Sequence, residues 1–129
     1  MRWSFYVLIL GIVIMSSCSG KREEDKASIA AKDYYEMLIA GQYDKFVASS
    51  INTDNIPKEY REQLVTNVKQ FVAVQKNERG GIREVRIVNS SYNKKKDSAD
   101  VLLVLSYKDR VNEEIVVPMI KKNGKWMMR

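Results

Sequence analysis

The chain contains no histidine and a single cysteine, at position 18. Without histidine there is no Ser-His-Asp triad, no imidazole general base and no histidine-ligated zinc site. A lone cysteine also excludes an intramolecular disulfide framework. Acid–base chemistry would therefore fall to Asp, Glu, Lys or Tyr side chains, and the sequence predicts neither a metal site nor a cofactor.

This 129-residue chain has only one long apolar run, which lies at the N-terminus. The rest is enough for one domain. The formal net charge is +6, from 22 basic and 16 acidic residues. A mild basic excess favours anionic surfaces such as lipid headgroups or acidic glycans. The basic residues alternate with acidic ones instead of forming a stripe, so we expect no nucleic-acid partner.

The N-terminus has the features of an export signal. Arg2 precedes the uncharged run Phe5–Met15, which as a helix would span roughly half of a ~30 Å hydrocarbon core. The run ends in Met15-Ser16-Ser17-Cys18, which resembles a lipobox, the cleavage motif of bacterial lipoproteins. The resemblance implies that residues 1–17 are removed and that Cys18 carries acyl chains such as palmitate, which hold the protein at a membrane. The alternative is an uncleaved transmembrane anchor with an incidental cysteine.

Residues 19–26 contain no apolar side chain and so cannot pack into a core. We therefore predict that residues 18–25, which begin with the lipidated Cys18, form a flexible tether. Within it, Glu23-Glu24-Asp25 resembles the acidic cluster that follows the cysteine in surface lipoproteins of the Bacteroidetes type, although Lys21-Arg22 departs from that pattern. The resemblance implies a cell-envelope protein anchored in the outer membrane. It leaves open which face of that membrane carries the protein, and one of the two is the cell surface.

Residues 26–129 are predicted to form a single α+β domain. Apolar residues recur with helical spacing over 26–40, 42–49 and 57–76. Gly41 favours the end of the first helix, and Pro57 fits the first turn of the third.

From Ile82 the apolar period changes from 3.6 to 2, which indicates strands. The strongest, 99–107, is apolar on both faces, as expected of a central strand partly covered on both sides. Pro118 in the next strand, 113–121, predicts a bulge or a solvent-side position there. Asn123-Gly124 predicts a type I′ hairpin before a short last strand. Helices followed by strands predict helices packed on one face of a curved antiparallel sheet of about four strands.

Two stretches carry a family resemblance. Tyr34-Tyr35 followed by residues 41–46, and the ending formed by residues 114–119 and 122–126, are similar to the nuclear transport factor 2-like (cystatin-like) superfamily, which includes lipoproteins of unknown function. The resemblance covers residues 26–129. It implies a cone-shaped domain in which the helices and a curved sheet enclose a pocket.

Five aromatic residues are expected to point into this cone, either as plain core or as a ligand-binding lining: Tyr35, Phe46, Phe71, Tyr107 and Trp126. Enzymes of the superfamily, such as ketosteroid isomerases and scytalone dehydratases, place acid–base residues in the pocket. Without histidine, that implies an Asp base with a Tyr donor, for which Asp33 with Tyr34 and Asp100 with Tyr107 are the candidates. Both aspartates are expected at the surface.

Three functions follow as hypotheses. The first is a non-catalytic, membrane-anchored lipoprotein domain that binds an envelope protein or a small ligand, with the acyl chains on Cys18 as its membrane contact. The second is a small pocket enzyme of isomerase or dehydratase type that uses Asp and Tyr. The third is a purely structural envelope subunit.

Overall fold

The computed structural model describes residues 22–53 and 55–129. The predicted signal peptide, Cys18 and the residues up to Lys21 lie outside the described residues, and what the sequence predicts of them remains a prediction. Within the described residues, no helix combines the length and the apolar character that crossing a membrane requires.

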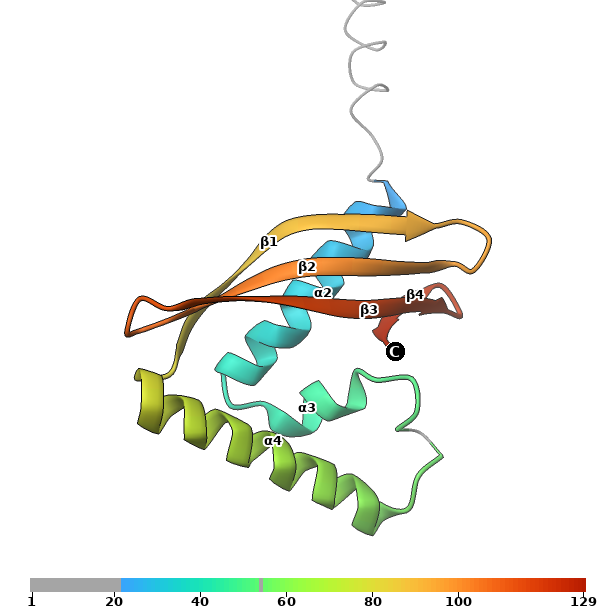
Figure 1. Ribbon diagram of the computed structural model, residues 1–129. Helices are drawn as coiled ribbons and strands as arrows, with labels where there is room; N and C mark the ends of the chain where they lie inside the picture. The colour runs from blue at the N-terminus through green and yellow to red at the C-terminus, as the bar shows by residue number, and fades with distance from the viewer. Residues whose placement is uncertain (1–21, 54) are drawn as a thin grey trace, which may run out of the picture.

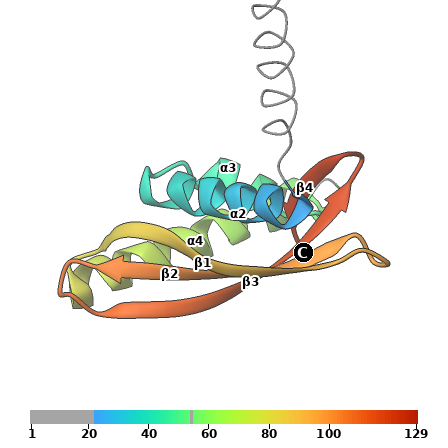
Figure 2. The ribbon, with the colours of Figure 1, turned by 90° about the horizontal axis from the view of Figure 1, so that it is seen from above.

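In the residues that the structure describes, three helices precede four strands. The helices are α2 (Glu23–Ile39), α3 (Tyr43–Ala48) and α4 (Lys58–Arg79), and the strands are β1 (Ile82–Asn93), β2 (Ser98–Tyr107), β3 (Asn112–Lys122) and β4 (Lys125–Met128). The strands form one antiparallel sheet in the order β1-β2-β3-β4 (Figure 1). Seen from above, α2 and α3 lie on one side of the sheet, and β4 curls toward them (Figure 2). The predicted α+β architecture is thus confirmed.

The core lies between α2 and the inner face of the sheet. Ala27 and Ala31 of α2 are fully buried, and their small side chains let the helix lie close to the strands. On β2, alternate residues face the helices, and Val101, Leu103 and Leu105 are 0–2 % exposed. The alternation predicted for this strand therefore supplies the inner face of the sheet.

The start of α2 differs from the prediction. The helix begins at Glu23, so the acidic residues 23–25 form its first turn and do not belong to a tether. Carboxylates are favoured there because the first turn exposes unpaired N–H groups and the positive end of the helix dipole. Glu23 is also fixed from outside the helix: its Oε1 lies 3.1 Å from Lys121 Nζ, and its Oε2 accepts a hydrogen bond of 3.1 Å from Trp126 Nε1.

Pro118 sits in an unbroken ladder. It lies opposite Asp100, and the register between β2 and β3 shows no shift, so the expected bulge is absent. Its carbonyl accepts a hydrogen bond from Arg129 N, which places its nitrogen on the β4 side, because N and C=O of one strand residue point the same way. The β4 pairing begins only at Met119, so the missing N–H costs the β2–β3 ladder nothing.

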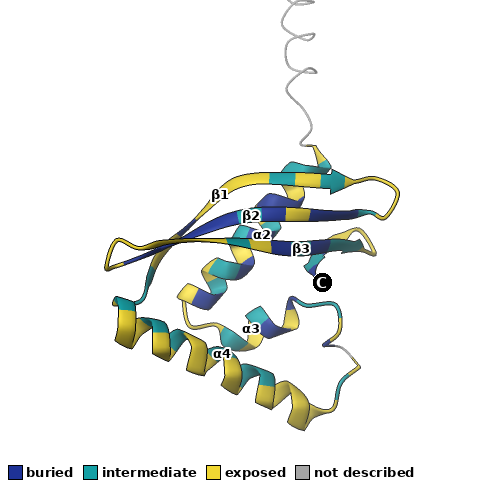
Figure 3. Cartoon of the chain, viewed as in Figure 1, coloured by how far each residue is buried: buried dark blue, intermediate teal, exposed yellow. Residues whose placement is uncertain are grey.

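The turns that close the sheet follow the sequence closely. Lys122 pairs with Lys125, and both turn residues have positive φ, 54° at Asn123 and 78° at Gly124. This is the backbone that a type I′ hairpin needs, as predicted. The second face of β2 is partly covered as well: Val104 and Ser106 are buried there, although none of the described helices packs on that side (Figures 2 and 3).

Candidate functional site

α4 is a long amphipathic helix that buries none of its residues (Figure 3). Its apolar stripe runs through Tyr60, Leu64, Val68 and Phe71, yet Tyr60 is 55 % and Phe71 41 % exposed. A surface helix normally packs such a stripe into the core. The apolar side of α4 therefore faces open space instead of a packed interior.

That space is a cavity of about 700 Å³, open to solvent. The stripe of α4 forms one wall, and α2, α3 and the β2–β3 ladder form the others. The lining is mainly apolar and includes Tyr35, Leu38, Phe46, Ile56, Leu105 and Ile115. A volume and a lining of this kind are typical of small-molecule sites.

One carboxylate faces the cavity from the sheet. Glu113 lies opposite Leu105 in the β2–β3 register and so shares its inner face. It accepts a hydrogen bond of 2.8 Å from the Tyr107 hydroxyl. Burial and this bond raise the pKa of Tyr107 to about 12, and burial, together with the Glu113 charge, raises the pKa of Tyr35. Both phenols are therefore protonated at neutral pH, and of these groups Tyr35 and Glu113 face the cavity.

α4 is held at both ends and also packs against α3, and its apolar stripe lines the cavity. At the C-terminal end, Gly80 takes a positive φ of 79°, and an added Cβ would lie 2.9 Å from Lys108 Cβ. Lys108 N donates to the Gly81 carbonyl, and the Arg79 guanidinium lies 5.1 Å from the centre of the Tyr107 ring. At the other end, the Arg61 guanidinium donates to the Thr53 carbonyl. The cavity wall is therefore pinned at both ends.

Three of the five predicted aromatic residues line the cavity: Tyr35, Phe46 and Phe71. The Tyr35 and Phe46 rings meet edge to face, with centroids 5.2 Å apart. Tyr107 is buried beside the cavity and reaches it through Glu113. Trp126 does not line this cavity, because it packs near the start of α2, where it bonds Glu23.

Neither candidate Asp–Tyr pair forms, and Asp33 and Asp100 are both exposed, as expected. Asp33 is exposed, while the hydroxyl of its neighbour Tyr34 donates to the Trp126 carbonyl. Asp100 and Tyr107 lie on opposite faces of β2, because their numbers differ by seven. The acidic partner of Tyr107 is Glu113, which the sequence reasoning missed.

A usable signal for Glu113 was present in the sequence. It is two residues before Ile115 and four before Val117 and so belongs to the inward-facing set of its strand. Reading the strand's alternation back to its first residues would have placed this carboxylate inside the cone.

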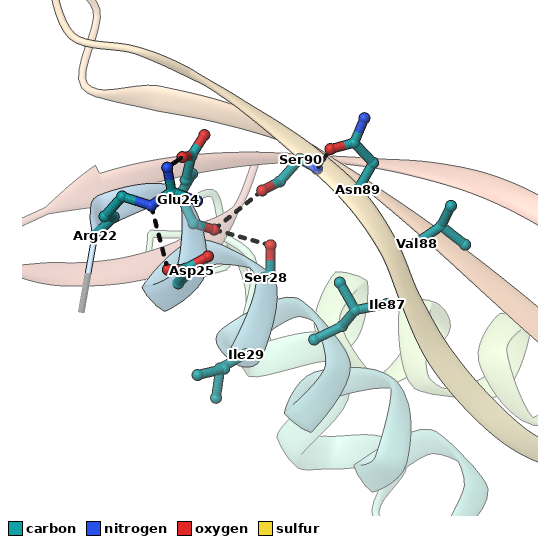
Figure 4. Close-up of a pocket in the computed structure, with 9 residues that line it drawn as sticks. All are labelled: Arg22, Glu24, Asp25, Ser28, Ile29, Ile87, Val88, Asn89 and Ser90. Carbon is teal, nitrogen blue, oxygen red and sulfur yellow. Dashed lines mark hydrogen bonds and ion pairs between the residues drawn. The ribbon is translucent and has the colours of Figure 1, made fainter.

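A second hollow, of about 490 Å³, lies between the first turn of α2 and β1. Figure 4 shows the Ser28 and Ser90 hydroxyls converging on the Glu24 carbonyl, at 2.8 and 3.2 Å. Arg22 pairs with Glu24 and Asp25. These polar groups are satisfied by one another, so this hollow is a weaker candidate site. Elsewhere in residues 22–53 and 55–129, no cluster of three or more acidic, His or Cys residues is placed to hold a metal ion.

No protein-family model matches the chain, and no curated protein matches its sequence. Among solved structures, it is similar to a Campylobacter jejuni protein named provisionally as an NTF2-like transpeptidase: 20 % identity, 76 % of this chain and 92 % of that chain covered, TM-score 0.62. A SEC-C motif protein from Rhodopseudomonas palustris aligns at 15 % identity over 86 % of this chain and 91 % of its own, but its TM-score of 0.47 is too low to support an argument.

The domain therefore has the nuclear transport factor 2-like fold, as the sequence resemblance implied. An identity of 20 % supports the fold alone. The chemistry of the cavity has to be argued from this chain's own residues.

Proposed function

We propose that this chain is a lipid-anchored envelope protein whose domain binds an apolar ligand, without catalysis, in the cavity beneath α4. The lipobox-like Met15–Cys18 supports the anchor. One observation carries the binding function: the apolar stripe of α4 faces a cavity of about 700 Å³, and no α4 residue is buried. A ligand between the stripe and the sheet would remove this apolar surface from water, which favours binding by about 25 cal/mol per Å² buried.

The same observation favours a ligand-binding domain over a purely structural subunit. Tyr60 and Phe71 line the cavity and remain about half exposed. In a helix that serves only to support the fold, large apolar side chains of this kind would be packed against the core. Glu113 and the polar residues at the rim, such as Asn67, supply a few directed hydrogen-bonding groups. An apolar cavity with few polar groups selects a ligand by shape and orients it by those groups.

A photo-crosslinking experiment tests the site. Full-length protein is irradiated with 4-hydroxybenzophenone, an apolar probe with one hydroxyl, and the labelled peptides are mapped by mass spectrometry. We expect labels on α4 and on the β2–β3 ladder. Leu64→Gln, which places an amide in the cavity wall, should reduce labelling at least severalfold. Ala73→Gln adds the same side chain at an exposed α4 position outside the cavity and should leave labelling unchanged. Equal labelling in the two variants would refute the site.

A second candidate function rests on a separate observation, the inward Glu113 carboxylate beside the Tyr107 phenol. In an isomerase or dehydratase of this fold, Glu113 would remove a proton next to a carbonyl. Because the Tyr107 hydroxyl already donates its one proton to Glu113, the donor to the developing oxyanion would be the phenol of Tyr35, which lines the cavity. The residues are therefore Glu and Tyr, in place of the Asp and Tyr that the sequence suggested.

An isomerase assay distinguishes the two functions. The substrate is a β,γ-unsaturated ketone, and its conversion to the conjugated isomer is followed by the ultraviolet absorbance of the product. The non-catalytic function predicts the same background rate for the native protein and Glu113→Gln. A native rate that exceeds the Glu113→Gln rate by 100-fold or more would establish the enzyme instead.

A further inference from the structure

Two hairpin turns rich in lysine lie at the same end of the sheet. The turn between β1 and β2 contains Lys94, Lys95 and Lys96, and the turn between β3 and β4 is flanked by Lys122 and Lys125. Ser98, the first residue of β2, pairs with Ile120 near the end of β3, and Lys121 N donates to the Asp97 carbonyl at 2.9 Å. The two turns are therefore neighbours, and we call their five lysines the lysine end.

The chain enters the folded domain at this same end. Glu23, in the first turn of α2, is bound to Lys121 and Trp126, each at 3.1 Å. The Trp126 ring also meets Tyr92 edge to face at 5.9 Å, and Tyr92 donates to the Asp97 carboxylate at 3.0 Å. Side-chain contacts thus fix the first turn of α2 against both hairpins. Figure 1 shows the start of α2 near the hairpin ends of the strands.

The lysine end keeps its positive charge available. Within the described part of the chain, no carboxylate lies within 4.0 Å of any of its five ammonium groups. Of the acidic residues near this end, Asp97 lies in the β1–β2 turn itself, accepts the Tyr92 hydroxyl and offsets one of the five lysine charges. The others are engaged elsewhere: Glu23 with Lys26 and Lys121, and Glu24 and Asp25 with Arg22. Most of the positive charge of the two turns is therefore left for an external partner.

Chain length brings a membrane within reach of this end. Cys18 and Arg22 are four residues apart, and a chain extends at most about 3.6 Å per residue. If Cys18 is acylated, the start of α2 stays within roughly 15 Å of the membrane that holds the acyl chains. We propose that the lysine end docks on the anionic headgroups of that membrane, so that the anchored domain has a fixed orientation. This inference rests on the proposed anchor, but not on the cavity.

The orientation is measured on full-length protein purified from membranes and reconstituted in vesicles of phosphatidylcholine, with or without phosphatidylglycerol. A single thiol introduced at the exposed Ser91, close to the lysine end, carries a fluorophore, and a second preparation carries it at Asn112, at the other end of the sheet. Quenching by a lipid with a nitroxide on its headgroup reports proximity. We expect stronger quenching at Ser91 than at Asn112 in anionic vesicles, and a smaller difference at high salt.

Two triple variants with equal charge change complete the test. Lys94→Gln, Lys95→Gln and Lys96→Gln together should lower the ratio of docked to undocked protein on the order of 100-fold, or roughly fivefold for each lysine. The matched control changes Lys45, Lys69 and Lys76 to Gln, which are exposed elsewhere, and should leave the ratio unchanged. Equal effects of the two triples would overturn the proposal, as would the same quenching pattern in neutral vesicles.

The intact mass of the purified protein reports acylation independently of the quenching. If the acyl mass is missing, the proposed lipid anchor fails and the Cys18 thiol is free. The labelling is then repeated with Cys18 changed to Ser, so that the quenching ratio still decides whether the lysine end faces the membrane.

Discussion

At the scale of single residues, Glu23 decides where the folded domain begins. Its carboxylate joins α2 to β3 through Lys121 and to β4 through Trp126. The hydrogen bond from Lys121 is the main cause of the lowered pKa of Glu23, and the Trp126 indole contributes as well. The same bond to Glu23 raises the pKa of Lys121. The pair therefore stabilises the fold only while both groups are charged.

Glu23→Gln should lower the melting temperature at pH 7 by a few degrees, because the charge is lost while the side-chain size is kept. Since the folded state lowers the pKa of Glu23, its contribution is complete above the ordinary value of 4.5 and disappears as the pH falls through the lowered value. The variant and the native protein should thus converge in acid, as followed by circular dichroism.

Glu36→Gln is the matched control, because Glu36 pairs with Lys32 at 3.6 Å on the exposed side of the same helix. An exposed pair of this kind contributes little, so its melting temperature should stay close to the native value. A loss as large as that of Glu23→Gln would contradict the role assigned to Glu23.

Tyr107 allows a similar test at alkaline pH. Its pKa is raised from 10.0 to about 12 by burial and by its bond to Glu113, so its contribution to stability is complete below pH 10 and is lost as the pH rises toward 12. Tyr107→Phe should cost about 1 kcal/mol at neutral pH. The variant should also lose less stability than the native protein between pH 10 and 12, because it has no phenol to ionise. Urea unfolding at several pH values measures the free energy of unfolding of both proteins. An unchanged alkaline profile would contradict the buried, protonated phenol.

At the scale of elements, β2 contributes much more buried apolar surface to stability than α4 does. β2 supplies Leu103 and other fully buried side chains, whereas α4 buries none of its residues. The difference follows from position: β2 lies between β1 and β3 under α2, while α4 is pinned at its ends and spans a cavity.

Truncation of one leucine in each element tests this difference. Leu103→Ala should lower the free energy of unfolding by about 2–5 kcal/mol, the usual cost for a buried leucine. Leu64→Ala should cost roughly 1 kcal/mol or less, because its side chain already faces open space. Urea unfolding measures both. Equal costs would mean that α4 packs against the sheet in solution and that the cavity is closed.

The elements themselves were largely predictable, because their signals are local. The alternation of β2, the Asn123-Gly124 turn and the helical spacing of α2 each lie within a few residues of one another. The spacing of apolar residues did not predict the cavity, because the stripe through Leu64 and Phe71 is the same whether a helix packs on a sheet or stands away from it. Only the family resemblance implied a pocket, and three of the five aromatic residues named for it, Tyr35, Phe46 and Phe71, line the cavity. Trp126 shows the same limit. Strand alternation correctly places it on the inner face of the sheet, but alternation does not tell which end of that face borders the cavity, and Trp126 lies at the other end.

At the scale of the whole molecule, the cavity and the lysine end lie at different ends of the sheet. Glu113, at the cavity, is near the start of β3, while the Lys121 that binds Glu23 is near its end. With the lysine end toward the membrane, the cavity would face away from it. A ligand would then enter from the aqueous side, and occupancy of the cavity would not compete with anchoring.

Replacement of Cys18 by Ala tests the anchor on which this arrangement depends. The thiol is the acyl acceptor in the proposed lipoprotein, so Cys18→Ala should abolish metabolic labelling by palmitate and leave the precursor unprocessed. Ser19→Ala, one residue further on, should be labelled and processed as the native chain is. Because residues 22–129 contain the whole described core, both variants should keep the native circular dichroism spectrum. Undiminished acyl labelling of Cys18→Ala would exclude the lipid anchor, and an unprocessed but membrane-bound native chain would favour the uncleaved anchor instead.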